Sequence, residues 1–250
     1  MAVIRKPFQG VYNIIRFNWH LYAISALLMV LCIMVASFLT GFSLLYLVAG
    51  LILTANIISL TVSVYVYDLS DLYKLYWIRE QDDASLIVNI HAGFDETSLL
   101  LKHKYKNAVL RVIDFYDPAK HTEVSIQRAR KAYPALPETI RSATTQLPLG
   151  NNVADKVFII FSAHEIRNVP ERTSFFHEVA RIVRPGGEIY VTEHLRDLPN
   201  FLAYNIGFFH FYSRHSWLSL FGRAGLKVIK EIKITPFIST FILTKNDTAF

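Results

Sequence analysis

Two polar segments have the residue types and spacing of a nucleotide-binding site. Residues 89–95 (NIHAGFD) follow an apolar run, and the small Ala92 and Gly93 would let the backbone approach a ligand closely. Asp114 follows Asn89 by 25 positions, close to the spacing of about 20 residues at which nucleotide-binding folds place an acid. Its carboxylate can accept hydrogen bonds from both hydroxyls of a ribose. The pattern predicts a site for a ligand that contains a ribose.

Each segment also has a purely structural explanation. The first could be an ordinary turn between a strand and a helix, with Asp95 or Thr97 as the helix cap. Asp114 could be a turn-forming acid before Pro118, and Asp117 lies nearer to that proline. The alternation of side chains along the strand favours Asp114 as the ribose-binding residue.

The chain around these segments alternates between strand-like and helix-like patterns. Apolar and β-branched runs predict strands at residues 86–91, 108–114, 156–161, 188–192, 226–235 and 237–244. Capping residues and helical spacing predict one helix that ends at residue 105 and others at 118–133, 170–184 and 216–224. Such alternation predicts a mostly parallel α/β sheet, here closed by an antiparallel hairpin. Ligands of these sheets bind beyond the carboxyl ends of the strands, where the polar segments would converge.

Two further segments indicate a family. Residues 147–152 (LPLGNN) and 184–189 (RPGGEI) each stand at or shortly before the start of a predicted strand. With the small-residue loop and Asp114, they make about residues 80–245 resemble the class I S-adenosylmethionine-dependent methyltransferases, most closely the branch that acts on quinones, sterols and small lipids. The resemblance implies a Rossmann-like, seven-stranded methyltransferase sheet and S-adenosyl-L-methionine as the cofactor.

The first motif of that family normally contains an acid and three spaced glycines. The matched positions here are Asn89, His91, Gly93 and Asp95, and only Gly93 is a glycine. Asn89 can still accept a hydrogen bond from a methionine amino group through its side-chain oxygen. Asp95 or Glu96 could supply the missing negative charge.

The resemblance also implies which residues contact the cofactor. They lie in the loops around the strand ends and are Asn89, His91, Ala92, Gly93, Asp114, Phe115, Gln146, Leu147 and Phe161. Tyr67 could close over the sulfonium, whose positive charge an aromatic face attracts, and Trp77 is the alternative. Both aromatic residues could instead belong to a belt at a membrane interface.

Methyl transfer needs an acceptor held in line with the sulfonium and, for some acceptors, a base. By their positions after two neighbouring strands, His164 and His194 are the predicted catalytic residues, with Glu165 and Glu193 beside them. A structural role for each imidazole is the competing explanation. Residues 201–212 (FLAYNIGFFHFY) suit the mouth of a pocket for a lipid-like acceptor, or a core helix at the domain edge.

A block of 51 consecutive residues, 17–67, contains no Asp, Glu, Lys or Arg. Because a helix needs about 20 apolar residues to cross a bilayer, the block predicts two transmembrane helices, at about 20–40 and 42–67. We expect residues 1–67 to be a membrane anchor and residues 68–250 to be one methyltransferase-like domain. A cleaved signal peptide and a hairpin buried in a soluble fold are the alternatives.

The basic residues around the apolar block predict its orientation. Arg5, Lys6 and Arg16 precede the first span, and the turn between the spans has no Lys or Arg. The positive-inside rule therefore places both termini and the catalytic domain of this integral membrane protein in the cytoplasm. The hairpin could also support a homo-oligomer.

Charge and cysteine content exclude other classes of protein. Residues 68–250 hold 23 Lys and Arg against 20 Asp and Glu, a balance that gives no indication of nucleic-acid binding. The single cysteine, Cys32, lies in the first apolar segment, which excludes an intrachain disulfide and a cysteine-based metal site. We expect no metal centre.

Together these features predict a membrane-anchored, S-adenosylmethionine-dependent methyltransferase. Its acceptor would be a hydrophobic, membrane-associated small molecule, such as a quinone-like, phenolic or lipid compound. The alternative is a catalytically inactive, methyltransferase-like membrane scaffold or partner-binding module. An NAD-dependent oxidoreductase is disfavoured, because no G-x-G-x-x-G opens the first helix of the domain.

Overall fold

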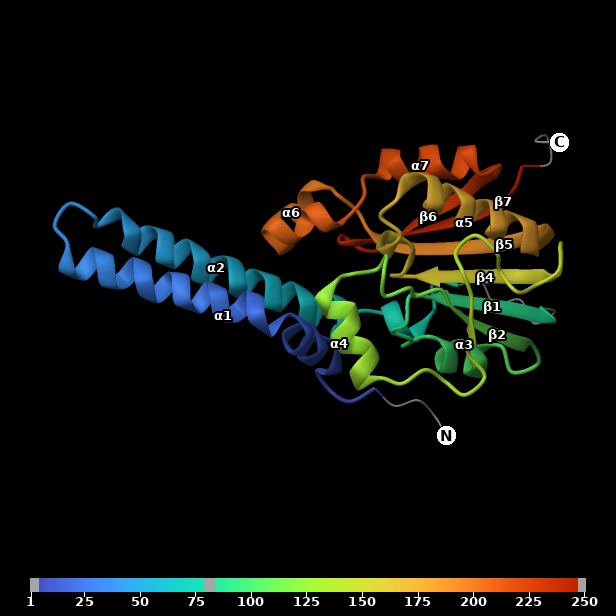
Figure 1. Ribbon diagram of the computed structural model, residues 1–250, viewed down its shortest axis with the longest axis horizontal. Helices are drawn as coiled ribbons and strands as arrows, with labels where there is room; N and C mark the ends of the chain where they lie inside the picture. The colour runs from blue at the N-terminus through green and yellow to red at the C-terminus, as the bar shows by residue number, and fades with distance from the viewer. Residues whose placement is uncertain (1–4, 79–83, 247–250) are drawn as a thin grey trace.

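The computed structural model describes residues 5–78 and 84–246 of the chain. It has two parts, a long helical hairpin and an α/β domain built on one sheet (Figure 1). The hairpin projects from one side of the domain and contacts it near its domain end (Figure 1).

Seven strands form the sheet in the order β3-β2-β1-β4-β5-β7-β6. They are β1 (Leu86–His91), β2 (Val109–Asp114), β3 (Ile140–Arg141), β4 (Ala154–Ile160), β5 (Val183–His194), β6 (Leu226–Thr235) and β7 (Ile238–Lys245). Strands β1 to β5 are parallel, and β7 is antiparallel to both β5 and β6. The predicted Rossmann-like sheet with a C-terminal antiparallel hairpin is confirmed. Its strand order reverses between β1 and β4, the point at which such sheets bind ligands.

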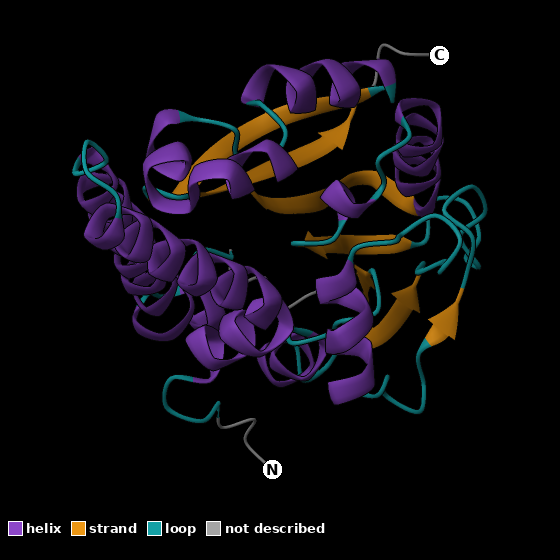
Figure 2. Ribbon diagram, turned by 60° about the vertical axis from the view of Figure 1, so that its left-hand side comes forward, coloured by secondary structure: helices purple, strands orange, loops and turns teal. Residues whose placement is uncertain are grey.

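Helices surround the sheet (Figure 2). They are α3 (Ser98–Lys104), α4 (Val124–Ala132), α5 (Val169–Ile182), α6 (Leu198–Tyr204) and α7 (Arg214–Arg223). Local sequence sets where some of them begin. The side chain of Asn168 accepts a hydrogen bond from the backbone N–H of Glu171 at the start of α5 (2.9 Å), and Pro170 occupies the first turn.

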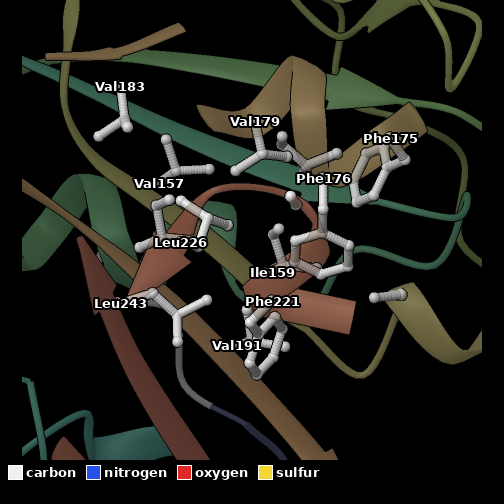
Figure 3. Packing of buried hydrophobic residues seen from close by; sticks show 14 of the residues in the cluster. Val157, Ile159, Phe175, Phe176, Val179, Val183, Val191, Phe221, Leu226 and Leu243 are labelled. Atoms are coloured by element: carbon white, nitrogen blue, oxygen red, sulfur yellow. The ribbon is translucent and has the colours of Figure 1, made fainter. Parts of the chain in front are cut away.

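The central strands are apolar because both faces of the sheet are covered. Val157 and Ile159 of β4 belong to one fully buried cluster with Val191 of β5 and with Phe175 and Phe176 of α5 (Figure 3). Burial of each such side chain contributes about 1.5–3 kcal/mol. This packing makes the sheet a rigid support for the loops at its edge.

The ends of several elements differ from the prediction. Helix α4 begins at Val124 and not at residue 118, because the Asp117 carboxylate accepts a hydrogen bond from the backbone N–H of Ala119 (2.9 Å) and forms a turn. Strand β5 begins at Val183, so the RPGG segment that was expected to separate helix from strand lies within the strand. Strand β3 has only two residues and no apolar pattern from which to predict it.

Helices α1 (Gln9–Phe38) and α2 (Leu44–Val64) form the hairpin. Both are long and apolar enough to cross a membrane. The turn between them contains Gly41 at a φ of 87°, a left-handed conformation that glycine adopts without steric cost. The side-chain amide of Asn56 donates a hydrogen bond to Ser25 Oγ (2.6 Å) and links the two helices.

The hairpin begins earlier than predicted. Helix α1 starts at Gln9 rather than near residue 20, and its backbone leaves helical geometry at Asn18. The first turn of α1 is held by the Asp68 carboxylate, which accepts hydrogen bonds from the backbone N–H groups of Gly10 (2.7 Å) and Val11 (2.9 Å). Negative charge at a helix N-terminus is stabilising. The segment before the kink therefore belongs to the domain surface, whereas the apolar remainder projects from it.

Helix α2 runs into the domain without a linker. It continues as a π-helical turn, η1 (Tyr65–Leu69), and a 3₁₀ turn, η2 (Leu72–Lys74). We call residues 9–17 and Tyr65–Leu69 together the hairpin base. Phe17 of the base meets Phe94 of the loop after β1, with ring centroids 5.6 Å apart. The base therefore covers the carboxyl ends of the strands.

Candidate active site

Asp114 ends β2 at the wall of a cavity of about 400 Å³. It is only 2% exposed, and its carboxylate accepts hydrogen bonds from the Tyr116 backbone N–H (2.9 Å) and from Arg130 Nη1 (2.7 Å). The cavity is lined by residues that end or follow β2 and β3 and by one residue of α5: Asp114, Phe115, Tyr116, Asp117, Pro118, Lys120, Arg141, Ser142, Ala143, Thr144 and Glu171.

Arg130 reaches from α4 across the loop after β1. Its guanidinium lies 4.2 Å from the centroid of the Tyr116 ring and pairs with Asp114. It is so close to Gly93 that a Cβ atom there would overlap it. Gly93 also has a φ of 92°, and this backbone conformation is the reason why the position favours glycine, since the Arg130 side chain could move. Arg130 was not among the predicted site residues, because nothing in its helical spacing distinguishes it from the other basic residues of α4.

The loop after β1 is held by its own polar side chains. Asn89 is buried, and its amide donates hydrogen bonds to Thr97 Oγ1 (3.0 Å) and Ser98 Oγ (2.8 Å), which tie the strand to the start of α3. His91 Nδ1 accepts a hydrogen bond from the backbone N–H of Gly93 (2.9 Å). The neutral imidazole therefore carries its proton on Nε2.

His91 Nε2 faces Asp95 Oδ2 at 4.0 Å. Burial lowers the pKa of His91, which keeps the ring neutral at physiological pH. Within residues 5–78 and 84–246 neither of these two atoms has a hydrogen-bond partner. A buried donor and a buried acceptor thus lie side by side with capacity to bind a ligand.

The other predicted cofactor contacts divide into two groups. Ala92 and Phe115 are buried at the strand ends, and Phe115 lines the cavity. Gln146 and Leu147 do not line it; Leu147 is buried, and its backbone N–H donates to Glu178 Oε2 (2.8 Å). Residues 141–144 line the cavity in their place. The short β3 brings that earlier segment to the site, which the sequence did not indicate.

Tyr67, Phe161 and His194 form an aromatic cluster at the ends of β4 and β5. His194 is stacked between Phe161 (5.3 Å between centroids) and Phe211 (4.9 Å), and its Nε2 lies 2.7 Å from the Tyr67 hydroxyl. Its Nδ1 lies 3.1 Å from Asn200 Oδ1 and 3.0 Å from the Phe237 carbonyl oxygen. Both neighbours of Nδ1 are acceptors, so Nδ1 carries the proton and Nε2 accepts from Tyr67.

Phe161 has a φ of 50°, in the left-handed region that bulky residues seldom occupy. Its strain of about 1–3 kcal/mol is maintained by the surrounding packing. The rings of Tyr67, Phe161 and His194 form an apolar layer between the hairpin base and the sheet, which we call the aromatic wall.

An ion-pair cluster lies beside this wall. His164 Nδ1 is 2.6 Å from Glu193 Oε2, and His164 Nε2 is 3.3 Å from Glu165 Oε1. Burial lowers the pKa of His164, but the two carboxylates outweigh it and raise that pKa to about 10. Burial likewise raises the pKa of Glu165, but the adjacent His164 lowers it to about 2. His210 Nε2 lies 3.9 Å from Glu165 Oε1.

Comparison with known proteins agrees with this geometry. A methyltransferase-domain family model matches residues 97–191. No curated protein matches the sequence significantly. An O-methyltransferase family 2 protein from Planctomyces limnophilus DSM 3776, in complex with apigenin, is similar in structure, with a TM-score of 0.52, 13% identity, and coverage of 77% of this chain and 61% of that chain.

Two S-adenosylmethionine-dependent methyltransferases are also similar. The one from Aquifex aeolicus has a TM-score of 0.45, 16% identity, and coverage of 64% of this chain and 81% of its own. The one from Methanosarcina mazei has a TM-score of 0.48, 17% identity, and coverage of 66% and 94%. The strand order and the family match agree. The domain has the class I methyltransferase fold.

The family match supports S-adenosylmethionine as the cofactor of this methyltransferase domain. This molecule combines an adenosine with an amino acid group and supplies an electrophilic methyl group on a positively charged sulfur. Asp114, beside the cavity, can accept hydrogen bonds from ribose hydroxyls once the Arg130 side chain turns away. His91 Nε2 and Asp95 Oδ2, a donor and an acceptor, match the carboxylate and the ammonium of the amino acid group. The residues present fit the cofactor.

Proposed function

We propose that the chain is a membrane-anchored methyltransferase that modifies a hydrophobic small molecule, such as a quinone-like, phenolic or lipid compound, taken from the bilayer. The main observation in support of this proposal is that the hairpin base contacts residues of the candidate active site. Tyr67 of the base binds His194 (2.7 Å), and Phe17 packs on Phe94 of the loop after β1. A hairpin that served only as a tether would have no need to contact these residues.

The apolar surface of the hairpin supports its insertion into a membrane. Large side chains along both helices are exposed, among them Leu27, Leu31, Leu47 and Leu51. A continuous apolar surface of this size is not stable in water. Neither helix is packed inside the protein over its most apolar stretch, which argues against a hairpin buried in a soluble fold.

Helix α6 and the 3₁₀ segment η4 (Asn205–His210) extend the apolar surface to the site. Helix α6 lies beside α2 (Figure 1), and the two segments expose Leu198, Leu202, Ile206 and Phe209. The end of η4 places His210 near Glu165, and the next residue, Phe211, stacks on His194. The segment from α6 to Phe211 thus connects the membrane-facing side of the protein to the ion-pair cluster. We propose that the acceptor reaches the site along this segment.

The proposed orientation follows from the basic residues before the first span. With Arg5, Lys6 and Arg16 on the cytoplasmic side, the hairpin returns the chain to the same side, and the domain is cytoplasmic. The site then opens toward the inner surface of the membrane.

The test is methyl transfer by the full chain reconstituted in phospholipid vesicles. S-adenosyl-[methyl-³H]methionine is supplied with a vesicle-bound hydroquinone or phenolic lipid, and in parallel with a water-soluble catechol. We expect label in the organic extract, reduced at least tenfold by Asp114→Asn. The control is Asp71→Asn, because Asp71 is an exposed acid that pairs with the exposed Lys74.

The other outcomes discriminate between the alternatives. Label only in the water-soluble acceptor would contradict a membrane acceptor while retaining the enzyme. Failure of wild-type protein to bind S-adenosylmethionine by equilibrium dialysis would contradict the enzyme and favour the inactive scaffold.

A further inference from the structure

We propose that His164 Nε2, the Glu165 carboxylate and His210 Nε2 form a binding site for a divalent transition-metal ion beside the acceptor. One donor atom from each residue lies within 4.8 Å of the others. Two imidazoles and one carboxylate are a ligand set typical of catalytic Zn²⁺ and Fe²⁺ sites. The proposal rests on the proposed function, since it assigns the ion a role toward the acceptor.

The distances suit a small ion. Ligands of a tetrahedral ion with bonds of about 2.0–2.1 Å lie about 3.3 Å apart. His164 Nε2 and Glu165 Oε1 have this separation, 3.3 Å. His210 Nε2, at 3.9 Å from Glu165 Oε1, needs only a small movement inward. His210 ends η4, a half-buried segment at the domain edge, where such a movement disturbs little of the core.

The second nitrogen of each imidazole faces a carboxylate. Glu193 Oε2 lies 2.6 Å from His164 Nδ1, and Glu123 Oε1 lies 3.4 Å from His210 Nδ1. Metal-binding histidines commonly donate their other N–H to a carboxylate, which fixes the ring and makes the ligating nitrogen more basic. In both His164 and His210, Nδ1 faces a carboxylate and Nε2 faces Glu165.

Glu165 has an unused ligand atom. Its side chain is 7% exposed, and its Oε2 is buried without a hydrogen-bond partner among the described residues. A buried carboxylate oxygen in this state is costly unless something binds it. Glu165 stands next to His164 in the 3₁₀ turn η3 (Ala163–Glu165), so both ligands come from one turn fixed at the end of β4.

Arg167 is the competing cation at the cluster. Its guanidinium contacts both ring nitrogens of His210 and lies 3.6 Å from Glu123 Oε1. Its side chain is 35% exposed and can turn outward. The Glu123, Glu165 and Glu193 carboxylates outnumber this guanidinium and the protonated His164, which must release its proton to bind an ion, so the local charge still favours a divalent cation.

The position of the cluster gives the ion a function. It lies at the carboxyl ends of β4 and β5, between the aromatic wall and the segment η4. Three protein ligands leave coordination positions for an oxygen of the acceptor. Coordination lowers the pKa of a bound hydroxyl and releases its proton to solvent. The site therefore favours acceptors with an ionisable hydroxyl, such as phenols and enols.

Metal binding is tested without cofactor or acceptor, so its result is independent of methyltransferase activity. The purified full chain in detergent is stripped with a chelator and titrated with Co²⁺, whose visible absorption reports coordination geometry. We expect one equivalent of Co²⁺ with a tetrahedral or five-coordinate spectrum, displaced by Zn²⁺. Glu165→Gln and His210→Ala should each weaken binding at least tenfold, and Glu193→Gln about 10–100-fold.

His215→Ala is the matched control, because His215 is an exposed histidine of α7 outside the cluster. The thermal midpoint of each chelator-treated variant shows whether that variant is folded. If His210→Ala does not fold, the result for Glu165→Gln decides the test, because this change keeps the shape of the side chain. No stoichiometric Co²⁺ binding by the wild type, or equal binding by wild type and Glu165→Gln, would overturn the metal site. Failure of methyl transfer with Co²⁺ binding intact would overturn only the proposed function.

Discussion

His164 follows β4 and His194 ends the neighbouring β5, yet their surroundings give them different charges, positive on His164 and none on His194. Burial opposes the charge on His164, but Glu193 and Glu165 raise its pKa to about 10. Burial lowers the pKa of His194 to about 4. A general base must be unprotonated and reach the acceptor, whereas His164 is protonated and the Nε2 of His194 accepts from Tyr67. At the scale of residues, neither histidine is in the state of a free base in this structure, and their catalytic role stays a prediction.

The buried neutral state of His194 predicts a pH dependence of stability. Its pKa is about 4 in the folded protein and 6.5 in an ordinary environment, so the unfolded chain binds more protons between these values. The contribution of the neutral His194 to the free energy of unfolding is complete above pH 6.5 and is lost as the pH falls to 4. It amounts to at most about 3 kcal/mol. Thermal midpoints of wild type and His194→Gln, measured from pH 7.5 to 4, should converge as the pH falls; parallel curves would contradict the prediction.

The ion pair between Arg130 and Asp114 predicts an unusual binding effect. Because the guanidinium occupies the carboxylate that the ribose needs, Arg130→Met should tighten S-adenosylmethionine binding by about 3–10-fold. The same change should lower stability by about 1–2 kcal/mol, since it removes the partner of a buried charge. Calorimetric titration tests this, with Arg128→Met as the control on the same helix, because Arg128 contacts Phe17 and His20 instead. Weaker binding in Arg130→Met would mean that Arg130 contacts the cofactor directly.

At the scale of elements, α6 and η4 carry an apolar surface that the domain does not cover. Ile206 is 81% exposed although it is a large aliphatic residue. Helix α6 is capped by Asp197, whose carboxylate accepts from the backbone N–H of Asn200 (3.2 Å), and α6 lies beside α2. The segment is therefore placed at the depth where the hairpin leaves the domain.

This placement predicts that η4 enters the lipid. In a Cys32→Ser background, a nitroxide attached to Ile206→Cys should be accessible to oxygen and shielded from a water-soluble nickel chelate in vesicles. The same label at Ile229→Cys, an exposed position of β6, should show the reverse. Equal accessibility of both labels to the nickel chelate would place η4 in water and remove the proposed acceptor path.

At the scale of the whole molecule, the hairpin and the domain are one structural unit. Asp68 caps α1 from a position 58 residues after Gly10, and Arg5 pairs with Glu96 of the loop after β1 at 2.8 Å. The N-terminal residues and the site loop thus stabilise each other. Detachment of the hairpin should therefore disturb the site itself.

The proposed membrane orientation predicts which positions face each side. In the Cys32→Ser background, Ser43→Cys in the turn of the hairpin and His215→Cys on α7 should react with an impermeant maleimide from opposite sides of sealed bacterial spheroplasts. We expect Ser43→Cys to react from outside and His215→Cys only after lysis. The reverse pattern would place the domain outside the cytoplasm, and reaction of both from one side would exclude a spanning hairpin.

The sequence alone determined the elements whose signal is local. The uncharged block at residues 17–67 indicated two long apolar helices, because hydropathy and length decide whether a segment can span a bilayer. The alternation of strands and helices, together with the resemblance, predicted the seven-stranded sheet, because the burial of a strand on both faces appears in its composition. The loop at residues 89–95 and Asp114 were selected because their chemistry follows from residue type and from position at a strand end.

The tertiary structure decided everything that depends on partners distant in the chain. Arg130 meets Asp114 from another element, and His210 reaches Glu165 across 45 positions, so no local pattern pointed to the ion pair or to a metal site. Residues 141–144 replaced Gln146 and Leu147 at the cavity because a two-residue strand sets their register. Charge and coordination depend on distances between side chains, and folding alone brings these side chains together.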